Sequence, residues 1–418
     1  MCETKTTAGR RRGRAAVLSE QDLDMIAAYK YKPGAYTHLD DLLTPFWNWA
    51  VTLLPLWMAP NLVTFIGLAG TCVASLLVTS YSPRLEGDHV PGWCCLLFAV
   101  ALFLYQTLDA IDGKQARRTN SSSPLGQLFD HGCDAAVKVV CCVAMCATLG
   151  LGPTPNVMVL FCLVEGVFYM AQWEEYHTGT LNWSNGYVGV TESQIIQMGL
   201  FVVTACFGQG MWSASLTLNL PEALGKDASI TVTILEAMVW GLIPPAAVLV
   251  SSNIRRVWAS RPEDLPQEER GLKTIGAFPG LQQLLAMVIA MSLGIALSTG
   301  PAFAVFEKHA GLQLFMLGVV TTHLTSHMIV HHMAKSALSL QDLACPSLIV
   351  LAAVTLNVYW PTLGLGESPP VDPEKALFAG AGLTMASYLR YVSGAISDIC
   401  WRLNIECFRI KHAGRKDD

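Results

Sequence analysis

Ten apolar stretches, each long enough to cross a bilayer, run through this chain and leave little room for a soluble domain. A spanning helix needs roughly 17 to 25 mostly apolar residues, because the bilayer interior offers no hydrogen-bond partners to an open backbone. Hydrophobic residues make up 52% of the chain and charged residues only 14%. We therefore expect an all-α polytopic membrane protein with about ten transmembrane helices. The predicted spans are residues 60–81, 91–112, 126–150, 155–175, 193–213, 229–251, 279–299, 310–333, 338–358 and 376–398.

The basic residues are distributed unevenly between the two sides of these spans. Lys and Arg cluster within residues 10–14, 114–118, 255–273 and 409–416, whereas the loops on the opposite side carry only Arg84, Lys226, Lys308 and Lys375. Because cytoplasmic loops carry an excess of Lys and Arg, both termini and the loop after the second span should face the cytosol. The expected membrane is the endoplasmic reticulum, with the Golgi as the alternative.

The chain divides into segments by composition. Residues 1–40 and 401–418 are predicted cytosolic tails, and residues 41–58 are rich in tryptophan, as is typical of an amphipathic helix lying in the membrane interface. About six spans fall within 59–251 and four within 279–400. The polar residues 252–278 form a predicted cytosolic linker between the two groups.

Four aspartates, Asp109, Asp112, Asp130 and Asp134, lie at the ends of two consecutive spans. The first pair is spaced i, i+3 and the second i, i+4, so each pair projects from one face of its helix. Carboxylates inside a membrane are costly unless they are paired, hydrated or bound to a cation. Hard oxygen ligands favour Mg²⁺ or Mn²⁺, and four carboxylates can hold two ions. Such a site suits displacement at phosphorus.

The residues between the two aspartate pairs are small or basic. Gly113, Ala116 and Gly126 leave space for close approach of a phosphate-bearing ligand, and Lys114 and Arg117 can neutralise it. The whole pattern therefore predicts a site for a diphosphate.

The run from Asp109 to Asp134 resembles the signature of the CDP-alcohol phosphotransferase family, D-x-x-D-G-x-x-A-R-x8-G-x-x-x-D-x-x-x-D, at every fixed position. The stretch Arg-Arg-Thr-Asn-Ser-Ser-Ser-Pro-Leu-Gly looks like the eukaryotic branch that transfers phosphocholine and phosphoethanolamine. Further similarity occurs around Asn61 and in the sequence Phe-Arg-Ile-Lys at 408–411. One departure is Gln127, where this branch is expected to carry Glu.

The resemblance implies transfer of phosphocholine or phosphoethanolamine from its CDP ester to diacylglycerol, which gives a phospholipid and CMP. Asp109, Asp112 and Asp130 would hold one Mg²⁺, and Asp109, Asp130 and Asp134 a second, with Mn²⁺ as a substitute. The CDP moiety would contact Asn61, Gly113, Lys114, Ala116, Arg117 and Gly126. A homodimer is implied by the resemblance, with residues 279–400 supporting packing or dimerisation. No nucleic acid is expected as a partner.

The acceptor hydroxyl must lose a proton during this reaction. His131 is the preferred general base, because an imidazole titrates near the operating pH, and Asp134 is the alternative. Glu192 either orients His131, lines the acceptor cavity or simply begins a helix. Trp173 and Tyr176 are candidate head-group contacts, since aromatic faces attract quaternary ammonium groups, or else ordinary interfacial aromatics.

Other functions remain open on sequence grounds. A relative that uses CDP-diacylglycerol and a soluble alcohol would share the motif, and a divalent-cation transporter could use the aspartates as a permeation site. A metal-dependent hydrolase would release the head group without a lipid acceptor. The sequence does not decide between choline and ethanolamine.

Overall fold

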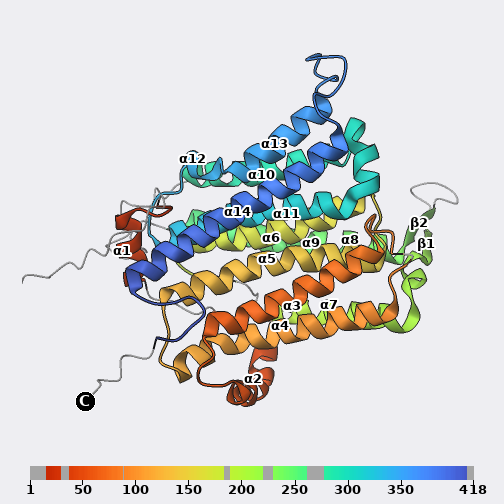
Figure 1. The fold of residues 1–418 in the computed structure, drawn as a ribbon. Coiled ribbons are helices and arrows are strands. Elements are labelled where there is room, and N and C mark those ends of the chain that lie inside the picture. The colour runs from red at the N-terminus through yellow and green to blue at the C-terminus, as the bar shows by residue number, and fades with distance from the viewer. Residues whose placement is uncertain are drawn as a thin grey trace, which may run out of the picture.

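The computed structural model describes residues 16–29, 37–87, 89–182, 189–219, 229–260 and 277–411. These residues form a bundle of long, roughly antiparallel helices with one small hairpin at its edge (Figure 1). The helices are α1 (Glu20–Ala28), α2 (His38–Ala50), α3 (Pro60–Tyr81), α4 (Gly92–Arg118), α5 (Pro124–Leu149), α6 (Pro155–Thr178), α7 (Val190–Phe207), α8 (Ile234–Gly241), α9 (Ile243–Ala259), α10 (Ala277–Leu297), α11 (Phe303–Met333), α12 (Leu340–Leu343), α13 (Pro346–Tyr359) and α14 (Pro373–Leu403).

Seven helical segments within the described residues are long and apolar enough to cross a membrane. Two shorter apolar helices, Leu281–Leu297 and Pro346–Tyr359, add to these. The tenth predicted span lies in α14, which is 31 residues long but carries Arg390, Asp398 and Arg402. Each of the ten predicted stretches thus contains a helix, and the prediction of an all-α polytopic membrane protein is confirmed.

The largest difference from the predicted boundaries lies around the sixth span. Residues 229–233 form strand β2 (Ser229–Thr233), which pairs antiparallel with β1 (Ser215–Asn219), instead of starting a helix. The β-branched residues of Ser-Ile-Thr-Val-Thr favour the extended backbone. The helical part of the span runs from Ile234 to Ala259, so it continues into the segment predicted to be a linker.

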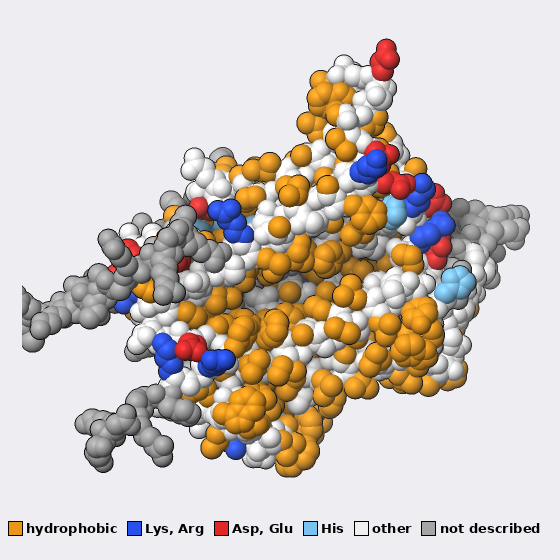
Figure 2. Space-filling view, viewed as in Figure 1, with side chains coloured by type: hydrophobic (Ala, Val, Ile, Leu, Met, Phe, Trp, Pro, Cys, Tyr) orange, Lys and Arg blue, Asp and Glu red, His pale blue; other side chains and the backbone are white. Residues whose placement is uncertain are grey.

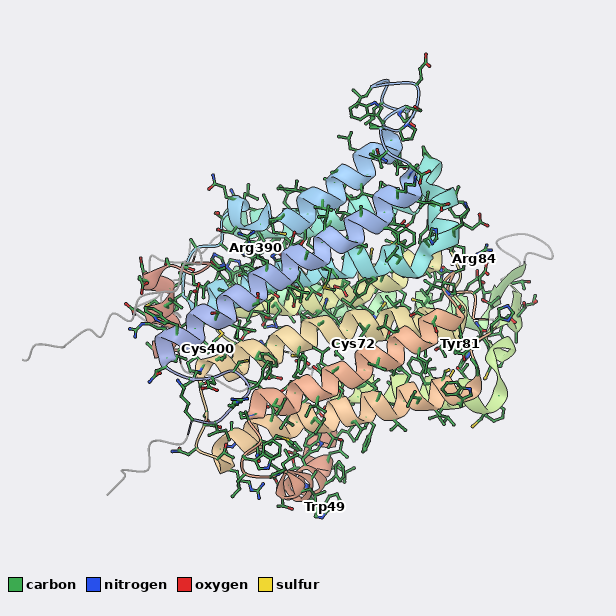
Figure 3. All side chains as sticks on the ribbon, in the orientation of Figure 1. Trp49, Cys72, Tyr81, Arg84, Arg390 and Cys400 are labelled. Atoms are coloured by element: carbon green, nitrogen blue, oxygen red, sulfur yellow. The ribbon has the colours of Figure 1, made fainter. Side chains whose placement is uncertain are left out.

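The bundle has two distinct ends. The aspartate end is the end at which α3 and α5 begin and α4 terminates, and the hairpin lies at the opposite end (Figure 1). Both α1 and the last turn of α14 lie at the aspartate end. Helix α2 crosses beneath α4, with Trp49 on its outer side (Figure 3). Trp49 is 58% exposed, consistent with the interfacial role predicted for this segment.

Close helix contacts build the core around α3, α4, α5 and α11. A methyl group added to Gly67 of α3 would lie 3.1 Å from the Cα atom of Tyr105 on α4. One added to Gly318 of α11 would overlap the side chain of Val139 on α5. Small residues of this kind let membrane helices approach each other. They fix the position of the helices that carry the aspartates.

The N-terminal segment is tied to the last helix. The backbone N–H groups of Val17 and Leu18 donate to Asp398 Oδ2 at 2.8 and 3.1 Å, and Arg402 Nε donates to Asp24 Oδ1 at 2.8 Å. Leu23 and Ile26 of α1 are fully buried against α11 and α14. Part of the segment predicted as an N-terminal tail is therefore a packed helix.

Candidate active site

Three of the four predicted metal ligands come together between α4 and α5. Asp109, Asp112 and Asp130 each offer a carboxylate oxygen, and these oxygens all lie within 4.8 Å of one another. The i, i+3 spacing places the first two on one face of α4, and the packing of α3 against both α4 and α5 brings Asp130 to that face. Three carboxylates at this separation repel one another strongly without a positive charge between them.

The unpaired atoms of this group fit a bound cation. The Oδ1 atoms of Asp109 and Asp130 are buried and have no hydrogen-bond partner among the described residues. Buried carboxylate oxygens are normally paired, hydrogen-bonded or coordinated to metal. A hard divalent cation between the three aspartates would satisfy these atoms.

Asp134 has a separate partner. It lies one helical turn beyond Asp130 on α5, and its Oδ1 atom accepts a hydrogen bond of 2.8 Å from the hydroxyl of Tyr105. Tyr105 is fully buried on α4, one turn before Asp109. No sequence motif singles out Tyr105, although its i, i+4 spacing to Asp109 places it on the aspartate face.

A third helix completes the wall of the site. Thr64 of α3 donates from its Oγ1 to Asp112 Oδ2 at 2.5 Å, which orients that carboxylate. Asn61, one turn earlier, lies opposite Gly126 of α5: a methyl group added to that glycine would lie 3.8 Å from Asn61 Oδ1. The predicted CDP contacts Asn61 and Gly126 therefore face each other.

The C-terminal segment closes the aspartate end. Asn61 Nδ2 lies 3.7 Å from the Sγ atom of Cys407, and Arg409 forms a backbone bridge with Met58. Phe408 lies between Phe65 and Phe129, with ring centroids 5.3 and 5.6 Å away. Residues of the predicted C-terminal tail thus border the site, and the Phe-Arg-Ile-Lys resemblance was the available signal.

The basic residues of the motif point in different directions. Lys114 Nζ donates to Asn48 Oδ1 of α2 at 2.9 Å, away from the aspartates. Arg117 is exposed, and its Nη1 atom lies 3.7 Å from where a methyl group on Gly113 would be. Ala116 lies between them, and its carbonyl accepts from Ser121 N at 2.9 Å. Arg117 is thus the motif cation nearest to the small residues.

Two further residues of the motif hold the chain around α4. Gln115 Nε2 donates to the carbonyls of Pro55 and Met58, and Arg118 Nη1 donates to those of Val51 and Leu54. These contacts wrap residues 51–58 onto the last turns of α4. Sequence reasoning had assigned them no role.

The other predicted site residues make contacts within the protein that hold the helices in place. His131 is buried on α5, next to Asp130. Glu192 Oε2 accepts from Gly189 N at 2.8 Å and caps α7, which is the helix-start interpretation. The Tyr176 hydroxyl donates to Ser336 O at 2.9 Å and accepts from Leu338 N at 3.0 Å, while Trp173 packs edge-on against His177.

Gln127 links the site to α1. Its Nε2 atom donates to the hydroxyl of Tyr29 at 3.3 Å, and that hydroxyl lies 3.3 Å from His332 Nε2 on α11. Gln127, which stands where the related branch is expected to carry Glu, therefore contacts the residue that ends α1.

A buried ion pair crosses the bundle beyond the site. Lys138 of α5 pairs with Glu165 of α6, which is fully buried and also accepts from Thr321 Oγ1 of α11 at 2.5 Å. Because Lys138 is paired with Glu165, it is not available to line a permeation path. The ion pair therefore does not support the function of a divalent-cation transporter.

Comparison with known proteins identifies the family. A sequence model of the CDP-alcohol phosphatidyltransferases matches residues 57–224, which include all four aspartates. The chain is 32% identical to cholinephosphotransferase 1 of Danio rerio over 95% of this chain and 96% of the relative. It is 32% identical to the protein of the same name from Xenopus laevis, over 94% and 90%, and 36% identical to that from Homo sapiens, over 78% and 75%. The predicted resemblance is confirmed, and this chain belongs to the CDP-alcohol phosphatidyltransferase family as a membrane-embedded enzyme of the phosphotransferase type.

Proposed function

We propose that the chain transfers phosphocholine from CDP-choline to diacylglycerol, producing phosphatidylcholine and CMP, with CDP-ethanolamine as a second donor to be tested. The observation that carries the proposal is the group Asp109, Asp112 and Asp130, half-buried between membrane helices, in which Asp109 and Asp130 each have a buried Oδ1 atom without a hydrogen-bond partner among the described residues. The names of the relatives favour choline over a CDP-diacylglycerol reaction.

The proposed cofactor is a pair of Mg²⁺ ions, for which Mn²⁺ could substitute. Asp109, Asp112 and Asp130 would hold one ion and Asp109, Asp130 and Asp134 the other. When bound, the ions would neutralise the diphosphate and the charge that develops on its oxygens. Thr64 and Tyr105 orient two of these carboxylates from neighbouring helices, so the ligand set is organised before substrate arrives.

The chain's own residues would then direct an in-line displacement. The diacylglycerol hydroxyl oxygen attacks the phosphorus that bears choline, and the bond from that phosphorus to the oxygen shared with CMP breaks. Arg117, close to Gly113, would offset the charge of the CMP phosphate. Asn61, Gly113, Ala116 and Gly126 would form the nucleotide wall, and Lys114 would support it through its contact with α2.

The proton of the acceptor goes to His131 in this proposal. One oxygen of Asp134 is occupied by the Tyr105 hydroxyl, and metal ligation would occupy the other. His131 is adjacent to Asp130 on α5 and is not one of the proposed metal ligands. Asp134 is the alternative base. Glu192, Trp173 and Tyr176 would act indirectly, by holding α6 and α7 in place.

The remaining assignments concern the whole chain. We assign catalysis to the helices within residues 59–251, interfacial attachment to 41–58 and support to 279–400, whose α11 packs along α5. The protein would lie in the endoplasmic reticulum membrane, or in that of the Golgi, with the aspartate end and both termini on the cytosolic side. There CDP-choline is available from water and diacylglycerol from the bilayer. A homodimer is proposed as the assembled form.

The test is a transfer assay with purified protein in lipid vesicles, diacylglycerol and Mg²⁺. CDP-choline and CDP-ethanolamine are offered separately, and CMP and phospholipid are both quantified. Equal amounts of CMP and phospholipid are expected, and the ratio of rates identifies the preferred head group. CMP without phospholipid would indicate a hydrolase, and no product from either donor would redirect the assignment to CDP-diacylglycerol chemistry.

A further inference from the structure

Residues 404–411, termed the C-terminal strap, leave α14 and return across the aspartate end of the bundle. Asn404 has φ 52° and ψ 42°, a left-handed conformation that asparagine tolerates, and it turns the chain away from the last turns of α14, which Cys400 marks in Figure 3. The dark blue end of the ribbon then passes the beginnings of α3 and α5 (Figure 1). Lys411 Nζ donates to the carbonyl of Asn404 at 3.2 Å and to Asn404 Oδ1 at 3.0 Å, so the strap closes on itself.

The strap holds the side-chain amide of Asn61, which is only 6% exposed. Asn61 Nδ2 donates to Cys407 Sγ at 3.7 Å. The Oδ1 atom of the same amide faces α5, since a methyl group added to Gly126 would lie 3.8 Å from it, in van der Waals contact. Cys407 therefore fixes which atom of the Asn61 amide is turned toward Gly126.

Phe408 connects the same two helices. Its ring centroid lies 5.3 Å from that of Phe65 on α3 and 5.6 Å from that of Phe129 on α5. Aromatic rings attract each other at these separations. Phe65 follows Thr64, and Phe129 precedes Asp130, so both ring partners adjoin residues of the site. The spacing of α3 and α5 beside the site thus depends on one ring of the strap.

Two further contacts attach the strap to these helices. Arg409 forms an antiparallel backbone bridge with Met58, just before α3 begins. On the α5 side, Ile405 and Cys407 pack against a hydrophobic cluster that includes Leu125 in the first turn of α5. The strap therefore bridges the beginnings of α3 and α5.

The strap lies where a water-soluble substrate reaches the bundle. Glu406, Arg409 and Lys411 are exposed. On the viewed face, charged side chains gather at the two ends of the bundle, whereas hydrophobic side chains cover the helices between them (Figure 2). A nucleotide ester enters from water and diacylglycerol enters from the bilayer, so the contacts of the strap belong to the nucleotide side of the site.

We propose that the C-terminal strap positions the nucleotide site. It sets the orientation of Asn61 through Cys407 and the spacing of α3 and α5 through Phe408. The inference rests on the proposed function, in which Asn61 and Gly126 contact the CMP portion of the donor. Cys407 and Phe408 act through their protein contacts and need not touch the nucleotide. The strap thus controls affinity for the CDP ester and leaves affinity for diacylglycerol unchanged.

The first experiment removes the sulfur acceptor from the full-length protein in lipid. Cys407→Ala should raise the KM for CDP-choline and the Kd for CMP, measured by calorimetry with Mg²⁺, by about fivefold, because one hydrogen bond to Asn61 is lost. Cys407→Ser should restore both values, since a hydroxyl also accepts. The kcat and the KM for dioleoylglycerol should stay within about twofold of wild type. Cys206→Ala, at an exposed cysteine near the end of α7, is the control.

Two results of this experiment would contradict the proposal. One is an equal rise in KM for both substrates, which indicates a general structural defect. The other is a failure of serine to restore the affinity for CMP.

A double substitution tests whether Cys407 acts through Asn61. In the Asn61→Ala background, Cys407→Ala should cause no further rise in the Kd for CMP, because the amide that it orients is already gone. Additive effects of the two substitutions would show that Cys407 acts by another route and would overturn its positioning role.

Phe408→Ala tests the spacing of the two helices. It removes both ring contacts and should raise the KM for CDP-choline by roughly tenfold, whereas Phe408→Tyr keeps the ring and should bind normally. Phe207→Ala, at a ring that is 75% exposed at the end of α7, is the control. Normal affinity of a folded Phe408→Ala protein would overturn the spacing role, and if this variant does not fold, the Cys407 series decides the proposal.

CMP binding separates the strap from the proposed function, because a CDP-choline reaction and a CDP-diacylglycerol reaction both need the CMP portion. If the wild type transfers no phosphocholine but the strap variants weaken CMP binding as expected, the proposed function fails and the strap assignment stands. If the wild type transfers phosphocholine and the variants bind CMP normally, the strap assignment alone is wrong. A wild type that binds no CMP would overturn both.

Discussion

Replacing Asp112, a proposed metal ligand, with asparagine removes the negative charge of the side chain and keeps its shape. The substituted amide could still accept from Thr64, but one negative charge would be lost from the group with Asp109 and Asp130. We expect Asp112→Asn to lower transfer by roughly 10²-fold or more, since ligand charge sets affinity for a hard cation. Asp41→Asn, at an exposed aspartate on α2, serves as the matched control. Substantial activity of Asp112→Asn at ordinary Mg²⁺ would contradict the metal site.

Tyr105 supports Asp134 through a single hydrogen bond, so its hydroxyl can be removed without losing the ring. Tyr105→Phe should reduce kcat about tenfold and raise the Mg²⁺ concentration needed for half-maximal rate, because a hydrogen bond to a charged group contributes about 1.5–3 kcal/mol. Tyr81→Phe, which alters a partly exposed ring on α3, should have no effect. An unchanged Mg²⁺ dependence in Tyr105→Phe would show that Asp134 needs no support.

His131→Ala tests the proposed general base. Turnover should fall by roughly 10²-fold or more, while binding of CDP-choline, measured by calorimetry with the purified protein, should persist. His38→Ala, at an exposed histidine that begins α2, is the control. Near-normal turnover of His131→Ala would transfer the role of base to Asp134.

At the scale of elements, the Lys138–Glu165 pair ties α5, α6 and α11 together. Lys138→Met should destabilise the protein by roughly 3–5 kcal/mol, because it leaves Glu165 charged and buried without its partner. The double variant Lys138→Met with Glu165→Gln should recover most of the loss. Thermal unfolding in detergent measures both, and equal stability of the single variant and wild type would show that the pair contributes little.

At the scale of elements, the helical repeat explains which features could be predicted from the sequence. The i, i+3 and i, i+4 spacings fixed the faces that carry the aspartates, and the apolar stretches located all ten helical segments. Contacts between distant segments have no such period: Tyr105 with Asp134, Thr64 with Asp112, and Cys407 with Asn61 depend on how the helices pack. The same holds for α1, whose partners lie on the last helix.

At the scale of the whole molecule, the proposed orientation places Asn120 on the cytosolic side and the loop between α13 and α14 on the lumenal side. The natural acceptor sequence Asn120-Ser-Ser should therefore remain without glycan. The double substitution Leu365→Asn with Glu367→Thr, at two exposed positions of that loop, should gain one. Gel mobility with and without endoglycosidase, after expression in microsomes, measures both. A glycan on Asn120 would invert the proposed topology.

The contact between α1 and α14 also constrains how the protein is made. Arg402 and Asp24 are 378 residues apart, so α1 emerges from the ribosome long before the α14 part of its binding surface exists. At 5–20 residues per second, that interval is roughly 20–75 s. During this time the contacts of Leu23 and Ile26 with α14 cannot form. The ion pair of Asp24 with Arg402 then forms only after α14 is complete, which makes it a late marker of finished membrane assembly.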